Sequence, residues 1–213
     1  MPPRFVPLTA LAAIVVACSS AGDGSGGTGP GPVPTDSTVA EDSLRFLRPA
    51  LAAPPFALRT VSFWAVRGQR REVRLMYQPA SGQADSVEFV RFRVDQKSLV
   101  TDSAGQPLAS GDSVLITLSI SDTLRLITEF QPAGLTFNPK EPARLWIKFG
   151  EADPDLNHDG LVTAADTTLL LGLQIWKLEQ PGEPWTLLPS TVDTVSQEVE
   201  ADVPGFTRYA VAY

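Results

Sequence analysis

The chain has 213 residues, of which 43% are hydrophobic and 19% charged, and its formal net charge is −7. This apolar content is enough for one hydrophobic core and excludes a wholly disordered chain, and the length favours a single folded domain. An acidic chain is a poor nucleic-acid binder, because phosphate contacts need a basic surface. One Cys excludes intrachain disulfides and zinc sites built from several Cys, and one His excludes sites that need two or three His.

The first 17 residues have the pattern of a secretory signal peptide. Arg4 supplies the positive charge, and residues 8–17 form an uncharged run that is too short to span a bilayer as a helix. The run ends in Val15-Val16-Ala17-Cys18, which resembles the lipobox of bacterial lipoproteins. The resemblance implies that residues 1–17 are removed and that Cys18 is acylated, with two or more acyl chains giving stable anchoring. The alternative is an ordinary secretory peptide with a Cys near its cleavage site.

Residues 18–40 are predicted to form the lipidated Cys18 and a flexible linker. Gly, Pro, Ser and Thr dominate residues 21–38, and such a segment cannot bury enough surface to offset the entropy lost on ordering. The expected partner of this part is a membrane, reached through Cys18. Ser rather than Asp follows the Cys, which by the rules of the lipoprotein family favours the outer membrane of the bacterial cell envelope.

The rest of the chain, residues 41–213, is predicted to form short β-strands separated by turns that contain Gly or Pro. The strand candidates are rich in β-branched and aromatic residues or alternate apolar and polar positions. They are residues 60–67, 72–77, 87–94, 113–120, 124–130, 143–149, 194–203 and 206–213. The Gly68-Gln69 turn predicts that the first two form a β-hairpin. Many short strands without alternating helices predict a mainly β fold, an antiparallel β-sandwich.

Two stretches resemble a known β-sandwich family. Residues 129–149 contain a strand, a Pro-x-Gly-Leu-x-Phe turn and a second strand, and residues 204–211 read PGFTRYAV. Together they resemble the domain shared by netrin receptors, ankyrins and zonula-occludens proteins, and its relatives in bacterial surface proteins. Some members of that family cleave themselves at His-Phe-Ser or His-Phe-Thr. Gly205 replaces that His, so we expect no self-cleavage, and we expect Thr207 to be a strand residue.

Residues 155–166 match the spacing of an EF-hand calcium loop. Side-chain oxygens fall at positions 1, 3 and 5, Gly160 at position 6, a backbone carbonyl at position 7, a hydroxyl at position 9 and a carboxylate at position 12. Calcium takes six to eight oxygen ligands, and His158 at position 4 is expected to point away. The pattern predicts a Ca2+ site formed by Asp155, Asn157, Asp159, Leu161, Thr163 and Asp166. Asp instead of Glu at position 12 makes the loop resemble those of dockerins.

The loop and a following helix are predicted to form one insertion in the sandwich, over residues 151–180. Residues 164–178 contain no Pro and a run of Leu, Ile and Trp, which predicts a helix of about four turns that packs on a sheet. A dockerin has two loop–helix units and this chain shows one, so cohesin binding is not expected. The expected role of the ion is structural. The alternative to a calcium loop is an Asx-rich turn before a helix.

Two further patterns are less specific. One is a group of Arg residues that could meet acidic polysaccharide or lipid head groups, although a solvated strand face is the favoured interpretation. It consists of Arg67, Arg70, Arg71 and Arg74. The other is the set of four Trp residues, which could stack on sugars but lie in apolar segments or beside Pro and so favour core packing. They are Trp64, Trp146, Trp176 and Trp185.

Taken together, the sequence predicts a lipid-anchored module at the cell surface or in the periplasm. Its expected role is binding or structural, and it is not expected to be an enzyme. Its expected partners are the membrane and a surface protein or polysaccharide. The competing function is a small hydrolase acting on polysaccharide or peptide, which would need two carboxylates about 5–10 Å apart in a cleft. A third function is docking to an assembly through an exposed apolar face on Leu169–Leu178.

Overall fold

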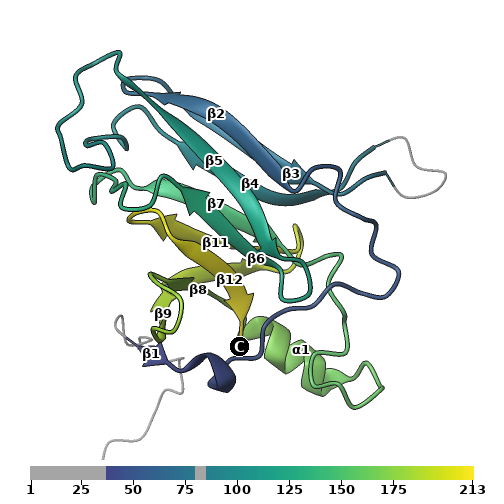
Figure 1. Cartoon of the computed structure of the whole chain (residues 1–213). Coiled ribbons are helices and arrows are strands. Elements are labelled where there is room, and N and C mark those ends of the chain that lie inside the picture. Colours follow the sequence, from purple (N-terminus) through teal and green to yellow (C-terminus); the bar gives the residue numbers. More distant parts are fainter. Residues whose placement is uncertain (1–36, 80–84) are drawn as a thin grey trace, which may run out of the picture. The chain divides into compact units, whose positions relative to one another are not determined.

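The computed structural model describes residues 37–79 and 85–213, which form two antiparallel β-sheets and one short α-helix (Figure 1). The predicted signal peptide, Cys18 and most of the predicted linker lie outside the described residues. In the described ranges, no helix has the length and the apolar character needed to cross a membrane. The mainly β, antiparallel fold predicted from the sequence is confirmed.

One sheet has seven strands in the order β1-β9-β8-β12-β6-β5-β2, and the other has five in the order β10-β11-β7-β4-β3. The strands are β1 (Thr38–Val39), β2 (Thr60–Val66), β3 (Arg71–Met76), β4 (Glu88–Val94), β5 (Ser113–Asp122), β6 (Ile127–Gln131), β7 (Ala143–Lys148), β8 (Gln174–Leu178), β9 (Trp185–Leu188), β10 (Ser190–Asp193), β11 (Glu198–Val203) and β12 (Arg208–Ala212). A 3-10 helix, η1 (Glu41–Ser43), follows β1, and the α-helix, α1 (Ala164–Leu171), lies between β7 and β8.

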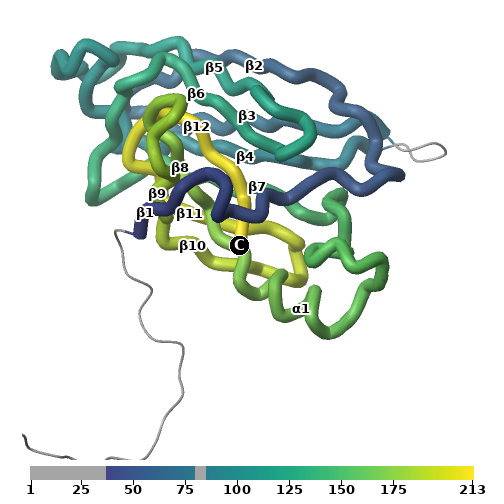
Figure 2. Tube along the Cα trace, turned by 60° about the horizontal axis from the view of Figure 1, so that its bottom comes forward, coloured from purple at the N-terminus to yellow at the C-terminus, as the bar shows by residue number. Residues whose placement is uncertain are grey.

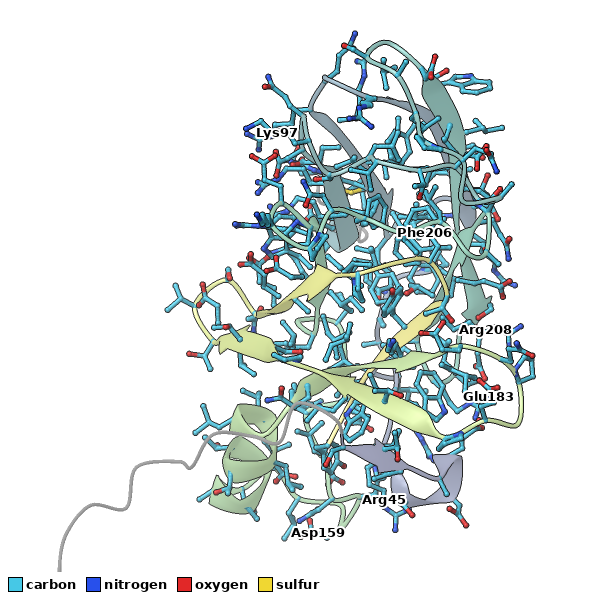
Figure 3. All side chains as sticks on the ribbon, turned by 90° about the vertical axis from the view of Figure 1, so that its left-hand side faces the viewer. Arg45, Lys97, Asp159, Glu183, Phe206 and Arg208 are labelled. Atoms are coloured by element: carbon cyan, nitrogen blue, oxygen red, sulfur yellow. The ribbon has the colours of Figure 1, made fainter. Side chains whose placement is uncertain are left out.

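The main core lies between the two sheets, because alternate residues of each strand turn inward. Phe92 of β4 is at its centre, with its ring centroid 5.1 Å from that of Phe130 in β6 and 5.5 Å from that of Phe206. Phe63 of β2 meets the same ring at 6.5 Å. Figure 3 shows Phe206 in the interior of the sandwich. Tilted and edge-on aromatic pairs add about 0.5–1.5 kcal/mol each beyond the burial of area, so this cluster joins the two sheets.

A second apolar cluster lies on the outer face of the seven-stranded sheet, where the N-terminal residues 37–50 cover it. We call these residues the strap. The buried members of the cluster are Leu44, Ile127, Trp176, Leu178, Trp185, Leu187, Ala210 and Ala212. Phe46 of the strap packs edge-on against Trp185 with a centroid distance of 5.1 Å. The folded part therefore begins inside the range predicted as linker, with Thr38 paired to Thr186 in β9.

The strap also pairs with the end of the chain. The Arg45 amide donates to the Tyr213 carbonyl at 3.1 Å, and the Tyr213 amide donates to the Arg45 carbonyl at 3.2 Å. One step further on, the Leu47 amide donates to the Val211 carbonyl at 3.0 Å. Figure 2 shows this purple segment running past the C-terminal end of β12.

An ion-pair cluster links the start of the strap to the turn between β5 and β6. Arg125 donates to Asp122 Oδ2 at 2.7 Å and pairs with Glu41 of η1. Partial burial acts to raise the pKa of Asp122, but hydrogen bonds from Arg125 and from the Leu124 amide outweigh it and leave this pKa below its ordinary value. A carboxylate with a lowered pKa contributes stability above its unfolded-state pKa and loses it as the pH falls through the folded-state value.

Asp122→Asn keeps the acceptor for the turn amides and removes the charge. We expect it to lower the free energy of unfolding at pH 7 by less than about 1 kcal/mol, because the ion pair is partly exposed to solvent. The difference from the parent should shrink as the pH falls below the ordinary carboxyl value of 3.8. Urea unfolding of both proteins at neutral and acidic pH measures this. A stability difference of the same size at both pH values would contradict the lowered pKa of Asp122.

The predicted hairpin of residues 60–67 and 72–77 is wrong. β2 pairs with β5 and β3 pairs with β4, so the turn at Gly68 carries the chain from one sheet to the other. The strand pair in residues 129–149 behaves in the same way, since β6 and β7 also lie in different sheets. A short turn between two strands is compatible with a hairpin, but it does not show that the strands share a sheet.

The predicted helix over residues 164–178 is wrong in its second half. α1 ends at Leu171, the Gly172 amide donates to the Leu169 carbonyl at 2.9 Å, and residues 174–178 form β8 between β12 and β9. A buried apolar run reads the same for helix and strand, and Gly172 was the signal for the helix end. The apolar docking face predicted on Leu169–Leu178 is therefore largely internal, although Leu171 stays exposed.

Smaller differences concern strand ends and short strands. The strands predicted at 124–130 and 194–203 begin later, because residues 123–126 and 194–197 are turns that end in Leu126 and Gln197 with positive φ. Strands β1, β9 and β10 were not predicted. Thr207 precedes β12 instead of lying in a strand, and its buried hydroxyl donates to the Leu178 carbonyl.

Candidate metal centre

The loop of residues 155–166 connects the end of β7 to α1, at the end of the sandwich where the strap meets the C-terminus. Figure 3 shows Asp159 and Arg45 at this same end. The loop turns on two residues in the left-handed region, His158 with φ 58° and Gly160 with φ 87°. Glycine adopts this conformation without a steric penalty, which is the reason the pattern requires it at position 6. His158 itself is exposed.

The first half of the loop is closed by carboxylate and amide oxygens that accept backbone hydrogen bonds. Asp155 accepts from the amides of Asp159 at 3.1 Å and Gly160 at 2.7 Å. The Asn157 oxygen accepts from the same Asp159 amide at 3.0 Å, and Asp159 accepts from the Leu161 amide at 2.9 Å. The side chains at positions 1, 3 and 5 therefore all turn toward the inside of one turn.

The second half of the loop is closed by Asp166, which is buried with 3% of its surface exposed. Its carboxylate accepts from the Thr163 amide at 2.7 Å and from the Asn157 amide at 3.2 Å, which ties position 12 back to position 3. These bonds and one from the Thr163 hydroxyl hold the pKa of Asp166 below its ordinary value, against the effect of burial. Thr163 also caps the N-terminus of α1 by accepting from the Ala165 amide at 3.2 Å.

The loop carboxylates form no ion pair with a cationic side chain of the described residues. None of the ion pairs among residues 37–79 and 85–213 involves Asp155, Asp159 or Asp166. In the same ranges, no three Asp, Glu, His or Cys side chains lie close enough together to hold a metal ion as they are placed. The structure thus joins the six predicted residues in one loop without forming a finished cage.

The donor set nevertheless fits a hard cation such as calcium. It offers three carboxylates, one amide oxygen, one hydroxyl and the Leu161 carbonyl, to which no backbone amide of the described residues donates. Each ionised carboxylate has about four lone-pair sites, so it can keep its amide hydrogen bonds and also bind an ion. Calcium takes such oxygen ligands in flexible geometry, whereas magnesium demands near-ideal octahedra.

The loop is fixed to the rest of the protein on two sides. Just before it, the Asp153 amide donates to the Arg48 carbonyl of the strap at 2.8 Å, and the Ala50 amide donates to the Glu151 carbonyl at 2.9 Å. From the other side, the Tyr213 hydroxyl donates to the Leu156 carbonyl. The loop, the strap and the C-terminal residue therefore form one hydrogen-bonded unit.

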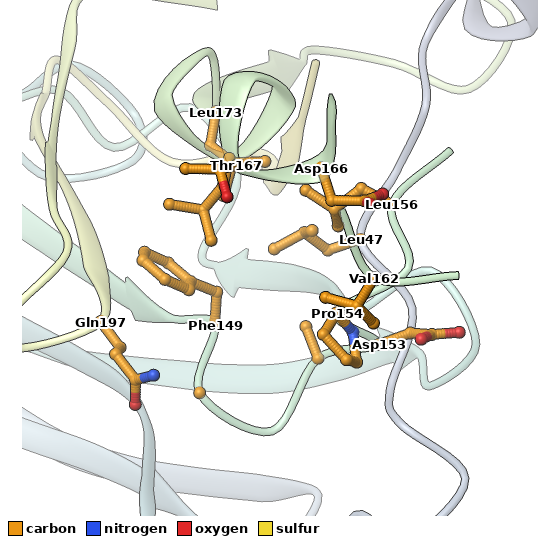
Figure 4. A pocket seen from close by; sticks show the side chains of 13 residues that line it. Leu47, Phe149, Asp153, Pro154, Leu156, Val162, Asp166, Thr167, Leu173 and Gln197 are labelled. Carbon is orange, nitrogen blue, oxygen red and sulfur yellow. The ribbon is translucent and has the colours of Figure 1, made fainter. Parts of the chain in front are cut away.

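A cavity of about 160 Å³ lies behind the loop, under α1 (Figure 4). Its lining is mainly apolar and includes Leu47 of the strap, Phe149 and Leu173. The two carboxylates that reach it, Asp153 and Asp166, accept hydrogen bonds from the amides of Asp155 and Thr163, so both serve the loop's own structure.

The other residues singled out in the sequence lie away from the loop. Trp146, Trp176 and Trp185 are buried as predicted, but Trp64 is 59% exposed on the outer face of β2, so core packing is wrong for it. The Arg residues have neutral or acidic neighbours. Arg67 donates to the Val100 carbonyl, Arg71 donates to Gln69, Arg74 pairs with Glu72 and Glu88, and Arg70 lies 3.7 Å from Asp95.

Comparisons of the chain with protein-family models, with curated proteins and with solved structures found no match.

Proposed function

We propose that the chain is a lipid-anchored, non-enzymatic module of the bacterial cell envelope, stabilised by Ca2+ bound in the loop of residues 155–166. The observation that carries the proposal is the loop itself, in which three unpaired carboxylates, one of them buried, are held by backbone amides at the spacing of a calcium loop. Anchoring through Cys18 and the place in the envelope rest on the lipobox pattern. The likeness to the netrin-receptor, ankyrin and zonula-occludens sandwich remains part of this proposal.

Bound calcium would stabilise the loop and fix the positions of α1 and the strap. Three carboxylates repel one another, and a divalent cation reduces their combined charge from −3 to −1. An ordered loop fixes the N-terminus of α1 and, through Asp153 and Arg48, the adjacent part of the strap. Extracellular loops of this kind bind calcium at about 10⁻⁴–10⁻³ M, so the site would be filled permanently outside the cell. The sandwich would then present its faces and edges to a surface protein or polysaccharide.

The test is thermal unfolding of the chain without residues 1–18, in excess chelator and in about 10 mM calcium, which is a hundredfold excess over a dissociation constant of about 10⁻⁴ M. At a hundredfold excess over the dissociation constant, binding to the folded state alone adds about 2.7 kcal/mol. For a domain of this size we expect the melting temperature to rise by about 5–10 °C. Asp155→Ala should abolish the rise, because it removes the ligand at position 1.

Asp102→Ala is the matched control. Asp102 closes an ordinary turn by accepting from the amides of Ala104 at 2.9 Å and Gln106 at 2.8 Å, as Asp155 does in the loop. Its loss should cost similar hydrogen bonds and leave the calcium-induced rise unchanged. No rise in the parent protein, or the same rise in Asp155→Ala, would show that the loop is an Asx-rich turn without a metal.

A further inference from the structure

β2 is the terminal strand of the seven-stranded sheet, and one of its two edges is unpaired by any strand of the described residues. On the other edge, the Ile120 amide donates to the Arg59 carbonyl and the Arg67 amide donates to the Asp112 carbonyl, both at 2.8 Å. Antiparallel hydrogen bonds join every second residue, so the odd-numbered residues from 59 to 67 bond to β5. The even-numbered residues Thr60, Ser62, Trp64 and Val66 therefore turn their amides to the free edge, as do the carbonyls of the first three, while the Val66 carbonyl accepts from the Gln69 amide at 3.0 Å.

The other sheet edges of the described residues are short, charged or covered. β1 has two residues and β10 has four. β3 carries Arg71, Glu72 and Arg74, and the far end of its edge is covered by residues 55–57, with the Ala57 amide donating to the Met76 carbonyl at 2.9 Å. β2 has seven residues, reads TVSFWAV, and contains no charge and no Pro. Natural sheet edges are protected from pairing by short strands, charged side chains, Pro or a covering segment. A long uncharged edge without this protection is suited to pairing with another strand.

The two Arg residues at the ends of β2 indicate which kind of strand could pair with its free edge. Arg59 immediately precedes β2 and forms no ion pair with a described residue, and Arg67 immediately follows it with only the neutral Val100 carbonyl as its side-chain partner. In a symmetric antiparallel pair of two β2 strands that sets Thr60 opposite Val66, Arg59 of one copy would face Arg67 of the other. Like charges directly opposite are destabilising, which disfavours a second copy as the occupant. Acidic residues at both ends of an incoming strand would be attracted.

The outer face of β2 adds a side-chain contact. Trp64 is 59% exposed, and its cross-strand partner Leu115 in β5 is 44% exposed, so the two form a small apolar surface beside the free edge. Next to them, the hydroxyls of Ser62 and Thr117 are 2.8 Å apart. A side chain of the added strand that lies on this outer face would contact the indole of Trp64, which favours a β-branched or apolar residue there.

We propose that the free edge of β2 binds an extended segment of a partner protein by strand addition, the segment being uncharged in its middle and acidic at both ends. Backbone hydrogen bonds to residues 60, 62, 64 and 66 supply affinity, and Arg59, Arg67 and Trp64 supply selectivity. This inference does not rest on calcium binding and identifies the place where the module would hold its partner.

The probe is the synthetic peptide Asp-Glu-Thr-Val-Thr-Val-Thr-Val-Thr-Glu-Asp, whose palindromic sequence fits either strand direction. The readout is amide hydrogen exchange of β2 by NMR, in the chain without residues 1–18. Without peptide, the amides of residues 60, 62, 64 and 66 should exchange fast and those of 61, 63 and 65 slowly. With peptide at about 1 mM, the even-numbered amides should become protected. A peptide with Lys at its four acidic positions should bind at least about fivefold more weakly at low salt.

Ser62→Pro removes one free-edge amide and no hydrogen bond to β5, so the sheet should survive, as Pro is tolerated at the open edge of a strand. The substitution should weaken binding of the peptide at least about fivefold, because one hydrogen bond is lost. Ser62→Ala is the control, since it keeps the amide and should bind like the parent. If Ser62→Pro fails to fold, Arg59→Glu serves instead and should discriminate against the acidic peptide.

Three results would overturn the proposal. They are no protection of the even-numbered amides at about 1 mM peptide, equal binding by the parent and by Ser62→Pro or Arg59→Glu, and protection that is already present without peptide. In the last case, protection that rises with protein concentration would identify a second copy as the occupant, and protection independent of concentration would identify another part of this chain.

Discussion

Trp185→Ala is expected to lower the free energy of unfolding by about 3–5 kcal/mol and to release the strap from the seven-stranded sheet. Trp185 is fully buried in the outer cluster, and Phe46 packs edge-on against its ring. Its indole nitrogen also donates to Glu41 of η1 at 3.4 Å. Val39 and Leu44 pack in the same cluster, and beyond Phe46 the strap is held by the buried Leu47 and by backbone hydrogen bonds to the end of the chain, so removing this ring loosens the first part of the strap.

Limited trypsin digestion measures release of the strap separately from global unfolding. Arg45 is an exposed cleavage site inside the strap, and its backbone is hydrogen bonded to Tyr213, whereas the bond after Arg48 leads to Pro49 and resists trypsin. In Trp185→Ala, cleavage after Arg45 should precede cleavage within the sandwich. Trp64→Ala is the matched control, because its side chain is exposed, and we expect a stability change of less than about 0.5 kcal/mol. Equal effects of the two substitutions would contradict the role given to the strap.

The same substitution should also reduce the calcium-induced rise in melting temperature. The strap contacts the segment before the loop through Arg48 and Ala50, and Leu47 lines the cavity beside Asp166. A mobile strap leaves these contacts unmade, so the loop has more conformational freedom to lose when it binds the ion. The calcium loop is therefore only partly a local structure, although its sequence pattern is entirely local.

This distinction explains what the sequence could and could not predict. The spacing in residues 155–166 predicts which side chains gather, because twelve consecutive residues with Gly160 at the turn determine most of their own hydrogen bonds. The alternation of apolar and polar residues likewise predicts the bounds of strands such as β4 and β5 closely, because this pattern depends only on residues two apart in the sequence. Neither pattern contains information about the strap, Tyr213 or the other distant residues that hold the loop in place.

The larger wrong predictions concern partners distant in sequence, whereas the displaced strand starts come from local turns. β2 and β3 alternate as strands should, but their assignment to different sheets depends on β4 and β5. Ile175 and Trp176 have the same apolar character in a helix as in a strand, and pairing with β12 and β9 decides for the strand. Trp64 is exposed because β2 lies at an edge and the strap covers only the opposite part of that face. The free edge of β2 follows from the topology alone and has no local signal.

Phe92→Ala is expected to cost about 3–5 kcal/mol as well, but with a different consequence for the metal site. Phe92 is fully buried and contacts rings from both sheets, so its removal leaves a cavity at the centre of the main core. Denaturant unfolding measures the loss, and Leu115→Ala is the control, since Leu115 is 44% exposed on the outer face.

The calcium-induced rise should be the same in Phe92→Ala as in the parent. The register partner of Phe92 is Leu145, which lies four residues before Phe149 at the loop end of β7, about 13 Å away along the strand. Changes this far apart without shared contacts add independently. Trp185→Ala and Phe92→Ala would then lower stability equally, but only the first would weaken the response to calcium. If both weakened it, the loop would depend on the stability of the whole sandwich and not on the strap that lies beside it.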